Sequence, residues 1–208
     1  MDTDIESTVD FLIFPGVEEL DITGPYEVFG KIHDVSEKTC KLHILASSEI
    51  TFCSHGLPLY RTQAFCQNQH GDVLVVPGGK GVREPSAERT AVVNHISRMY
   101  GYYDLIISIC TGTFLLEKAG LLKEKTCTTH TRYQDLLRKK GYTVLSNRIV
   151  HHGPLITSTG VTAGIDASLY AVSILYGNPV AQEIIERIEY PFSIEDIIEM
   201  AAVIQVHP

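Results

Sequence analysis

Residues 104–120 read DLIISICTGTFLLEKAG, and this stretch decides the fold. Residues 104–109 form a mainly apolar run, which is typical of a strand buried on both faces of a sheet. Residues 113–119 follow as a helix, and Gly120 is its expected stop. Cys110 and Gly112 lie in the turn between strand and helix. A strand, a tight turn and a helix in this order are the repeating unit of α/β proteins.

The same alternation of strand and helix patterns extends to both ends of the chain. Clear strands are expected at residues 9–14 (VDFLIF), 41–46 (KLHILA) and 73–76 (VLVV). The other expected elements are a hairpin at 51–61, strands at 143–145, 149–151 and 155–158, and helices at 20–32, 85–100, 132–140, 162–176, 180–190 and 194–206. Strands that are apolar on both faces need helices on both sides, so we expect an α/β fold with one doubly wound, mostly parallel sheet. No linker or repeat interrupts it, which predicts a single domain over residues 1–208.

Composition narrows the classes of function. Lys and Arg number 17 against 25 Asp and Glu, giving a formal net charge of −8, which disfavours nucleic acid as a partner. No apolar run approaches the ~20 residues of a membrane helix, and the acidic N-terminus is unlike a signal peptide. Five irregularly spaced cysteines argue against a disulfide framework. We therefore expect a cytoplasmic protein that acts on a small molecule, without a nucleic-acid or membrane partner.

Cys110 is the strongest candidate for a reactive side chain. A turn from strand to helix holds its central residue in a strained, exposed position. The N–H groups and the positive dipole end of the following helix are expected to lower the pKa of the thiol, which favours a nucleophilic thiolate. The other cysteines are interpreted as small buried core residues: Cys40, Cys53, Cys66 and Cys127.

Two further strand ends carry candidate residues, because ligands of such sheets bind outside the carboxyl ends of the strands. Asp21 follows the first strand, and it could either cap the helix that begins there or act as the acid/base partner of a thiolate. Gly78 and Gly79 follow the VLVV strand. Their backbone N–H groups could form an oxyanion hole, although Pro-Gly-Gly is also an ordinary turn.

The histidines give no catalytic or metal-binding pattern. His130 is interpreted as a capping or packed residue at the start of a helix. His151 and His152 are neighbours in a strand, so they point to opposite faces of the sheet. No spacing of His, Cys and carboxylate residues resembles a zinc site, and we expect no metal.

Seven ordered motifs together resemble the ThiJ/PfpI superfamily, flavodoxin-like relatives of glutamine amidotransferase domains, and in particular its isocyanide hydratase branch. They are FLIFP (11–15), LDITGP (20–25), VPGG (76–79), ICTGT (109–113), AGLL (119–122), TTH (128–130) and VTAGID (161–166). The resemblance implies that Cys110 is the nucleophile, Asp21 the catalytic carboxylate and Thr111 an active-site hydroxyl, with Gly79 as a backbone donor. It also implies a homodimer that needs no cofactor.

Two departures separate this chain from the protease-like and glyoxalase-like branches. Those relatives usually have His directly after the Cys, where this chain has Thr111, and Glu where it has Asp21. The transcription regulators of the superfamily add a helix-turn-helix region, for which we expect no room before Pro208.

The expected function is that of a lyase: a hydratase that adds water to an isocyanide and gives an N-substituted formamide through a Cys110 thioimidate. The alternatives are a glyoxalase or deglycase that acts on 2-oxoaldehydes, a cysteine-based sensor of oxidative stress, and a protein that binds a small molecule without turnover.

Overall fold

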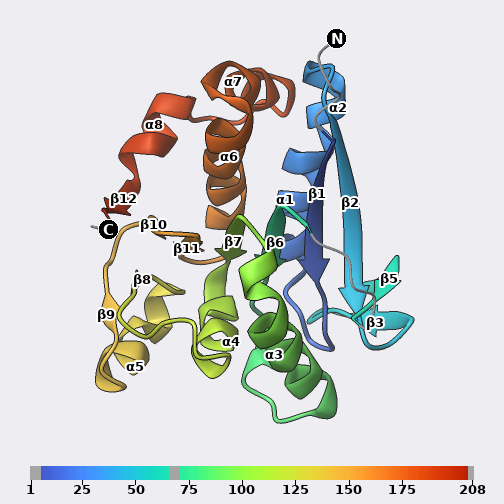
Figure 1. Ribbon diagram of the computed structural model, residues 1–208, viewed down its shortest axis with the longest axis vertical. Helices are drawn as coiled ribbons and strands as arrows, with labels where there is room; N and C mark the ends of the chain where they lie inside the picture. Colours follow the sequence, from blue (N-terminus) through green and yellow to red (C-terminus); the bar gives the residue numbers. More distant parts are fainter. Residues whose placement is uncertain (1–5, 66–70, 206–208) are drawn as a thin grey trace.

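An eight-stranded sheet forms the centre of the molecule, shown in Figure 1 by a computed structural model that describes residues 6–65 and 71–205. The strand order is β12-β10-β11-β7-β6-β1-β2-β5. Every neighbouring pair is parallel except β10 and β11, so the sheet is mostly parallel, as predicted. The strands are β1 (Glu6–Leu12), β2 (Thr39–Ala46), β5 (Gln63–Ala64), β6 (Val73–Val76), β7 (Leu105–Ser108), β10 (Ile149–His152), β11 (Leu155–Ser158) and β12 (Ala201–Ile204).

Helices follow the strands along the chain. α1 packs against α6, and α3 packs against α4, while α7 lies against α6. The helices are α1 (Glu19–Gly30), α2 (Ile32–Val35), α3 (Ala87–Met99), α4 (Thr113–Lys118), α5 (Gln134–Lys139), α6 (Ala163–Tyr176), α7 (Asn178–Arg187) and α8 (Ile194–Glu199). The α/β doubly wound, flavodoxin-like architecture expected from the sequence is confirmed.

Two small sheets lie outside the central one. The hairpin expected at 51–61 is present as β3 (Ile50–Phe52) and β4 (Pro58–Tyr60), which pair antiparallel. A second pair joins β8 (Thr126–Cys127) to β9 (Thr143–Val144) in parallel. Short 3₁₀ turns also occur in the loops, of which η1 (Lys80–Val82), η3 (Cys110–Gly112) and η4 (Thr131–Tyr133) contribute to the site described below.

The middle of the sheet explains why the apolar runs are uninterrupted. Every residue of β6 and of β7 is buried. Both strands have neighbours on both sides and helices over their faces, so even Ser108 is fully buried. Its hydroxyl is hydrogen-bonded to Thr113 Oγ1 at 2.9 Å, which satisfies both polar groups in the core.

The helix expected over 194–206 is wrong in its second half. α8 ends at Glu199, and residues 201–204 (AAVI) form β12, which pairs in parallel with β10. The preceding residues have a helical pattern, and a run of four residues is too short to show a strand periodicity of its own. Pairing with the edge of the sheet determines that these residues form a strand. Residue 206 lies outside the described residues.

Smaller differences concern boundaries and burial. The helix expected over 20–32 divides at Lys31 into α1 and α2, and the first strand ends at Leu12. Cys40, Cys53 and Cys127 are buried free thiols as expected, whereas Cys66 lies outside the described residues. Within the described parts of the chain, no helix is long and apolar enough to cross a membrane.

Candidate active site

Cys110 occupies a strained turn directly after β7. Its φ angle is +55°, in the left-handed region that side chains with a Cβ rarely adopt, as expected for an elbow. The backbone is held on both sides: its N–H donates to the Thr159 carbonyl at 2.8 Å, and its carbonyl accepts from the Thr129 hydroxyl at 2.7 Å. The side chain is only 6% exposed, so the expectation of an exposed thiol is wrong. These bonds keep the strained turn in place.

Asp21 lies in the first turn of α1 and is fully buried. Glu18 occupies the N-cap position, and Asp21 Oδ2 accepts a hydrogen bond from the Gly78 N–H at 2.8 Å, so the capping interpretation of Asp21 is wrong. Its other oxygen, Oδ1, has no hydrogen-bond partner among the residues that the structure describes. The carboxyl group is therefore bound to the turn after β6 by one oxygen, while the second oxygen is buried without a partner among the described residues.

Gly78 and Gly79 bring this turn against the elbow. A Cβ on Gly78 would lie 2.6 Å from the Thr111 backbone nitrogen, so only glycine fits there, and Gly79 has a φ of +127°. The Gly78 N–H donates to Asp21, and the Gly79 N–H donates to Thr111 Oγ1 at 3.1 Å. The oxyanion role of the two glycines stays a prediction, and it requires these N–H groups to exchange their present partners for a ligand.

Thr111 lies between the glycine turn and the thiol. Besides accepting from Gly79, its hydroxyl is 3.3 Å from the Gly79 carbonyl and also within hydrogen-bonding reach of the Cys110 sulfur. A single hydroxyl proton serves one of these acceptors at a time. Rotation of this proton can therefore couple the state of the thiol to the glycine turn.

The pKa values of Cys110 and Asp21 are both raised, and the Asp21 charge contributes to the shift of the Cys110 thiol. Burial raises the pKa of the Asp21 carboxyl to about 7, the Gly78 N–H opposes this, and the charge of Glu18 adds to it. Burial and then the Asp21 charge raise the pKa of the Cys110 thiol to about 12, against hydrogen bonds from the N–H groups of Thr111 and Val161. The expected lowering of the thiol pKa is wrong, because desolvation and the neighbouring carboxylate outweigh the hydrogen bonds from Thr111 and Val161.

A cavity of about 430 Å³ opens over the elbow. Cys110, Thr111 and Gly79 lie on its wall, together with His130 and Val161. His130 is the cap of η4, where its Nδ1 accepts the Arg132 N–H at 3.2 Å, so the capping interpretation is confirmed. The sequence does not show its place on the cavity wall, since hydrogen bonds from Thr129 and His130 to the Cys110 carbonyl bring this distant segment to the elbow.

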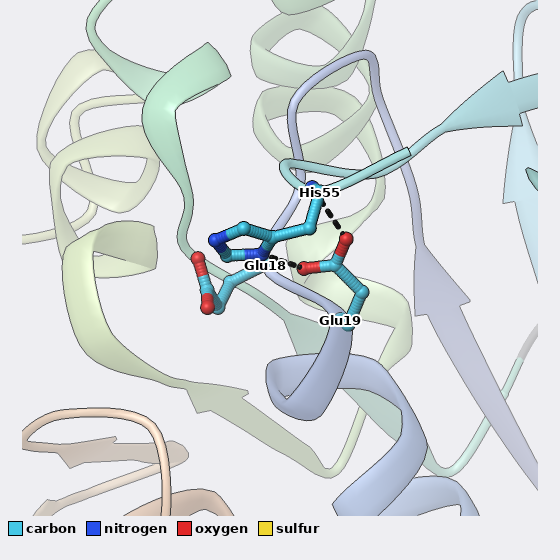
Figure 2. A group of neighbouring side chains, drawn as sticks. All are labelled: Glu18, Glu19 and His55. Atoms are coloured by element: carbon cyan, nitrogen blue, oxygen red, sulfur yellow. Dashed lines mark hydrogen bonds and ion pairs between the residues drawn. The ribbon is translucent and has the colours of Figure 1, made fainter. Parts of the chain in front are cut away.

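A group of three possible metal ligands lies at the rim of this cavity. Glu18, Glu19 and His55 offer ligand atoms within 4.8 Å of one another, and Glu18 and His55 also line the cavity. Figure 2 shows both Glu19 oxygens bonded to His55, with the Glu18 carboxylate on the other side of the imidazole ring. The hydrogen bond with Glu19 raises the pKa of His55, which favours an imidazolium between two carboxylates. Spacing along the sequence could not reveal this group, because the N-cap and first residue of α1 and the β3–β4 loop supply it separately.

Fold and site together define a flavodoxin-like α/β protein with a cysteine at a strained strand-to-helix elbow. The family model for DJ-1/PfpI matches residues 7–173, and the chain belongs to this family. The isonitrile hydratase of Pseudomonas putida is 37% identical over 183 residues, which cover 88% of this chain and 78% of that protein. The sequence resemblance to ThiJ/PfpI proteins is thereby confirmed.

More distant relatives share the fold but carry other names. The Parkinson disease protein 7 homolog of Danio rerio is 27% identical and covers 83% of this chain, with 92% of its own length matched. The crystal structure of a ThiJ/PfpI family protein from Pseudomonas syringae matches with a TM-score of 0.78 and 27% identity, over 90% of this chain and 76% of that chain. Membership in the family therefore leaves more than one activity open, and the side chains of the site have to distinguish them.

Proposed function

We propose that the protein is an isocyanide hydratase, a lyase that needs no cofactor and converts an isocyanide and water into an N-substituted formamide in the cytoplasm. The observation that carries this proposal is the Cys110 thiol on the wall of a cavity, with the buried Asp21 carboxyl close enough for its charge to raise the pKa of the thiol. The identity to the isonitrile hydratase supports it, since isonitrile and isocyanide name the same functional group.

The first half of the reaction adds the thiol across the isocyanide carbon. Asp21 accepts the Cys110 proton as the sulfur attacks the terminal carbon, and a C–S bond forms. Asp21 then returns the proton to that carbon, which leaves a thioimidate, Cys–S–CH=N–R. A carboxyl group with a pKa of about 7 is suited to both directions of transfer near neutral pH.

The second half releases the product. Water attacks the thioimidate carbon while Asp21 takes one water proton and passes it to the nitrogen. The C–S bond then breaks, the remaining hydroxyl proton returns through Asp21 to the sulfur, and the formamide leaves. Thr111, whose hydroxyl lies next to the sulfur, is proposed to orient the water.

The other functions considered make different demands on the thiol. A sensor of oxidative stress depends on a thiolate, whereas the pKa of the Cys110 thiol is raised to about 12. A glyoxalase or deglycase would use the same cavity and is distinguished by its substrate. An assay of the purified protein with cyclohexyl isocyanide and with methylglyoxal tests the proposal: formamide production supports it, and turnover of methylglyoxal alone refutes it.

The rate is expected to depend on the ionisation of Asp21. Below its pKa of about 7 the carboxyl group is protonated and cannot accept the thiol proton, so kcat/KM should fall tenfold for each pH unit on the acid side. It should be level between about pH 8 and 10, because the thiol remains protonated there. A pH profile of kcat/KM checks this, and a flat profile between pH 5 and 8 contradicts the role of Asp21.

We also propose that the protein is a homodimer. The β3–β4 hairpin exposes Phe52 and Tyr60 at 61% and 62%, an apolar surface that a second copy could cover. Sedimentation at micromolar concentration is expected to give twice the mass of the chain, and Phe52→Ser should shift this equilibrium toward monomer. A wild-type protein that sediments only as monomer would contradict the proposal.

A further inference from the structure

A second cavity lies directly beside the one over Cys110. Its volume is about 210 Å³, and the two cavities share Arg83 and Tyr133 as lining residues. Arg83 Nη1 donates to the Tyr133 hydroxyl at 2.6 Å, and its guanidinium group lies 5.1 Å from the centre of the Tyr133 ring. Arg83 is exposed and Tyr133 half-buried. Two side chains that contact each other therefore lie between the two cavities.

The inner surface of the second cavity is apolar. Val82 and Phe114 form part of it and are 1% and 8% exposed, and Tyr133 packs edge-to-face on Phe114 with ring centres 6.4 Å apart. Cavities of about 150 Å³ lined by such side chains accept a benzene ring. This cavity therefore has room for one ring with a small substituent.

The rim of the second cavity is positively charged. Four cations line it, Arg83, Arg89, Lys118 and Lys140, against the single carboxylate of Glu117. Glu117 is paired with Lys140 at 3.1 Å, whereas Arg89 and Lys118 form no ion pair within the described part of the chain. In a chain with a net charge of −8, this local excess of positive charge is not explained by composition. An anionic group at the rim would be attracted to the unpaired cations.

We propose that this second cavity, the anion subsite, binds the substituent of the substrate, and that the substituent is an aromatic or short aliphatic group ending in a carboxylate. The inference rests on the proposed isocyanide hydration: the isocyanide carbon lies at Cys110, and the substituent passes the Arg83–Tyr133 contact. The substrate class is then that of isocyano carboxylates, with the apolar body on Phe114 and the carboxylate near Arg89 and Lys118.

Binding of the product tests the subsite separately from turnover. Calorimetry with 4-formamidobenzoate and its neutral methyl ester should show that the acid binds about tenfold more tightly at low salt, because two incompletely screened cations face it. The preference should disappear in the double variant Arg89→Gln, Lys118→Gln and decrease in Lys118→Gln alone. Lys139→Gln removes an exposed cation of α5 that lines neither cavity, and it should retain the full preference.

Turnover of the corresponding isocyanides then separates this inference from the proposed function. The wild type should have a higher kcat/KM for 4-isocyanobenzoate than for its methyl ester, and the double variant should hydrate both equally well. Equal binding of acid and ester by the wild type, or a preference that survives the double substitution, overturns the subsite even if both isocyanides are hydrated. Binding that behaves as expected without hydration of either isocyanide refutes the reaction and leaves the subsite supported.

Discussion

Cys110→Ser should abolish isocyanide hydration, with a loss of about 10⁴-fold or more in kcat. The pKa of a serine hydroxyl is far above that of a thiol, and a carboxylate whose own pKa is about 7 cannot remove its proton at a useful rate. Oxygen is also a poorer nucleophile than sulfur toward the soft isocyanide carbon. The substitution changes one atom, and the hydrogen bonds that hold the elbow come from the backbone of residue 110, so the fold should remain.

Cys40→Ser is the matched control for this substitution. Cys40 is also a buried free thiol, but it lies on β2, and its hydrogen bonds with Ser7 and Tyr176 suit a hydroxyl as well. The control should keep its full activity. Steady-state kinetics of both variants, with circular dichroism to verify folding, decide the matter: a folded Cys110→Ser variant that keeps most of its activity would exclude covalent catalysis by the thiol.

Asp21→Asn should lower kcat by about 10²–10⁴-fold, which is the usual contribution of general acid–base catalysis. The amide oxygen can still accept the Gly78 N–H, so the link between α1 and the glycine turn is kept while proton transfer is lost. Asp135→Asn, a change of an 83% exposed carboxylate on α5, is the control and should have no effect on the rate.

The same variant should be more stable than the wild type at pH 8. The pKa of Asp21 is about 7 in the folded state and 3.8 as an unperturbed group. Between these pH values the folded state binds more protons than the unfolded state, so the folded state loses stability as the pH rises from about 4 to about 7. The full shift corresponds to about 4 kcal/mol above pH 7 as an upper limit. Asn carries no charge, so its Tm should exceed that of the wild type at pH 8, and the difference should shrink toward pH 4. An Asp21→Asn variant as active as the wild type would contradict the role of Asp21 in proton transfer. A Tm below that of the wild type at pH 8, with the same difference at pH 4, would contradict the assignment of a buried, titrating carboxylate.

The elbow could be predicted from the sequence because every part of it is local. A buried strand, a short turn and a helix follow one another within residues 104–120, and their order alone places Cys110 at the strand end. The double glycine after β6 was predictable for the same reason. Because both strands are parallel neighbours, their carboxyl ends had to meet, and this gave the approximate position of the site.

The parts that could not be predicted depend on contacts between distant segments. Asp21 and its partner Gly78 are 57 residues apart, so the pattern around Asp21 fitted a helix cap equally well. The pKa of Cys110 depends on how deeply the elbow is buried and on the Asp21 charge, neither of which a motif contains. The anion subsite could not be predicted because α3, α4 and α5, which are separate in the sequence, all contribute lining residues. The sequence predicts a helix for the four residues of β12, because their partner strand, β10, lies some fifty residues earlier in the chain.

The proposed placement of the reacting group in one cavity and of the substituent in the adjoining one has a consequence for engineering. The reacting end depends on tightly packed positions such as Gly78, where any side chain would collide with the backbone of the elbow. The rim of the second cavity carries exposed side chains such as Lys118 and Leu136, which lie on the surfaces of α4 and α5. A library that varies these exposed positions can therefore change which substituents are accepted while the chemistry stays intact. Selection for a different range of substrates should then leave the turnover number unchanged.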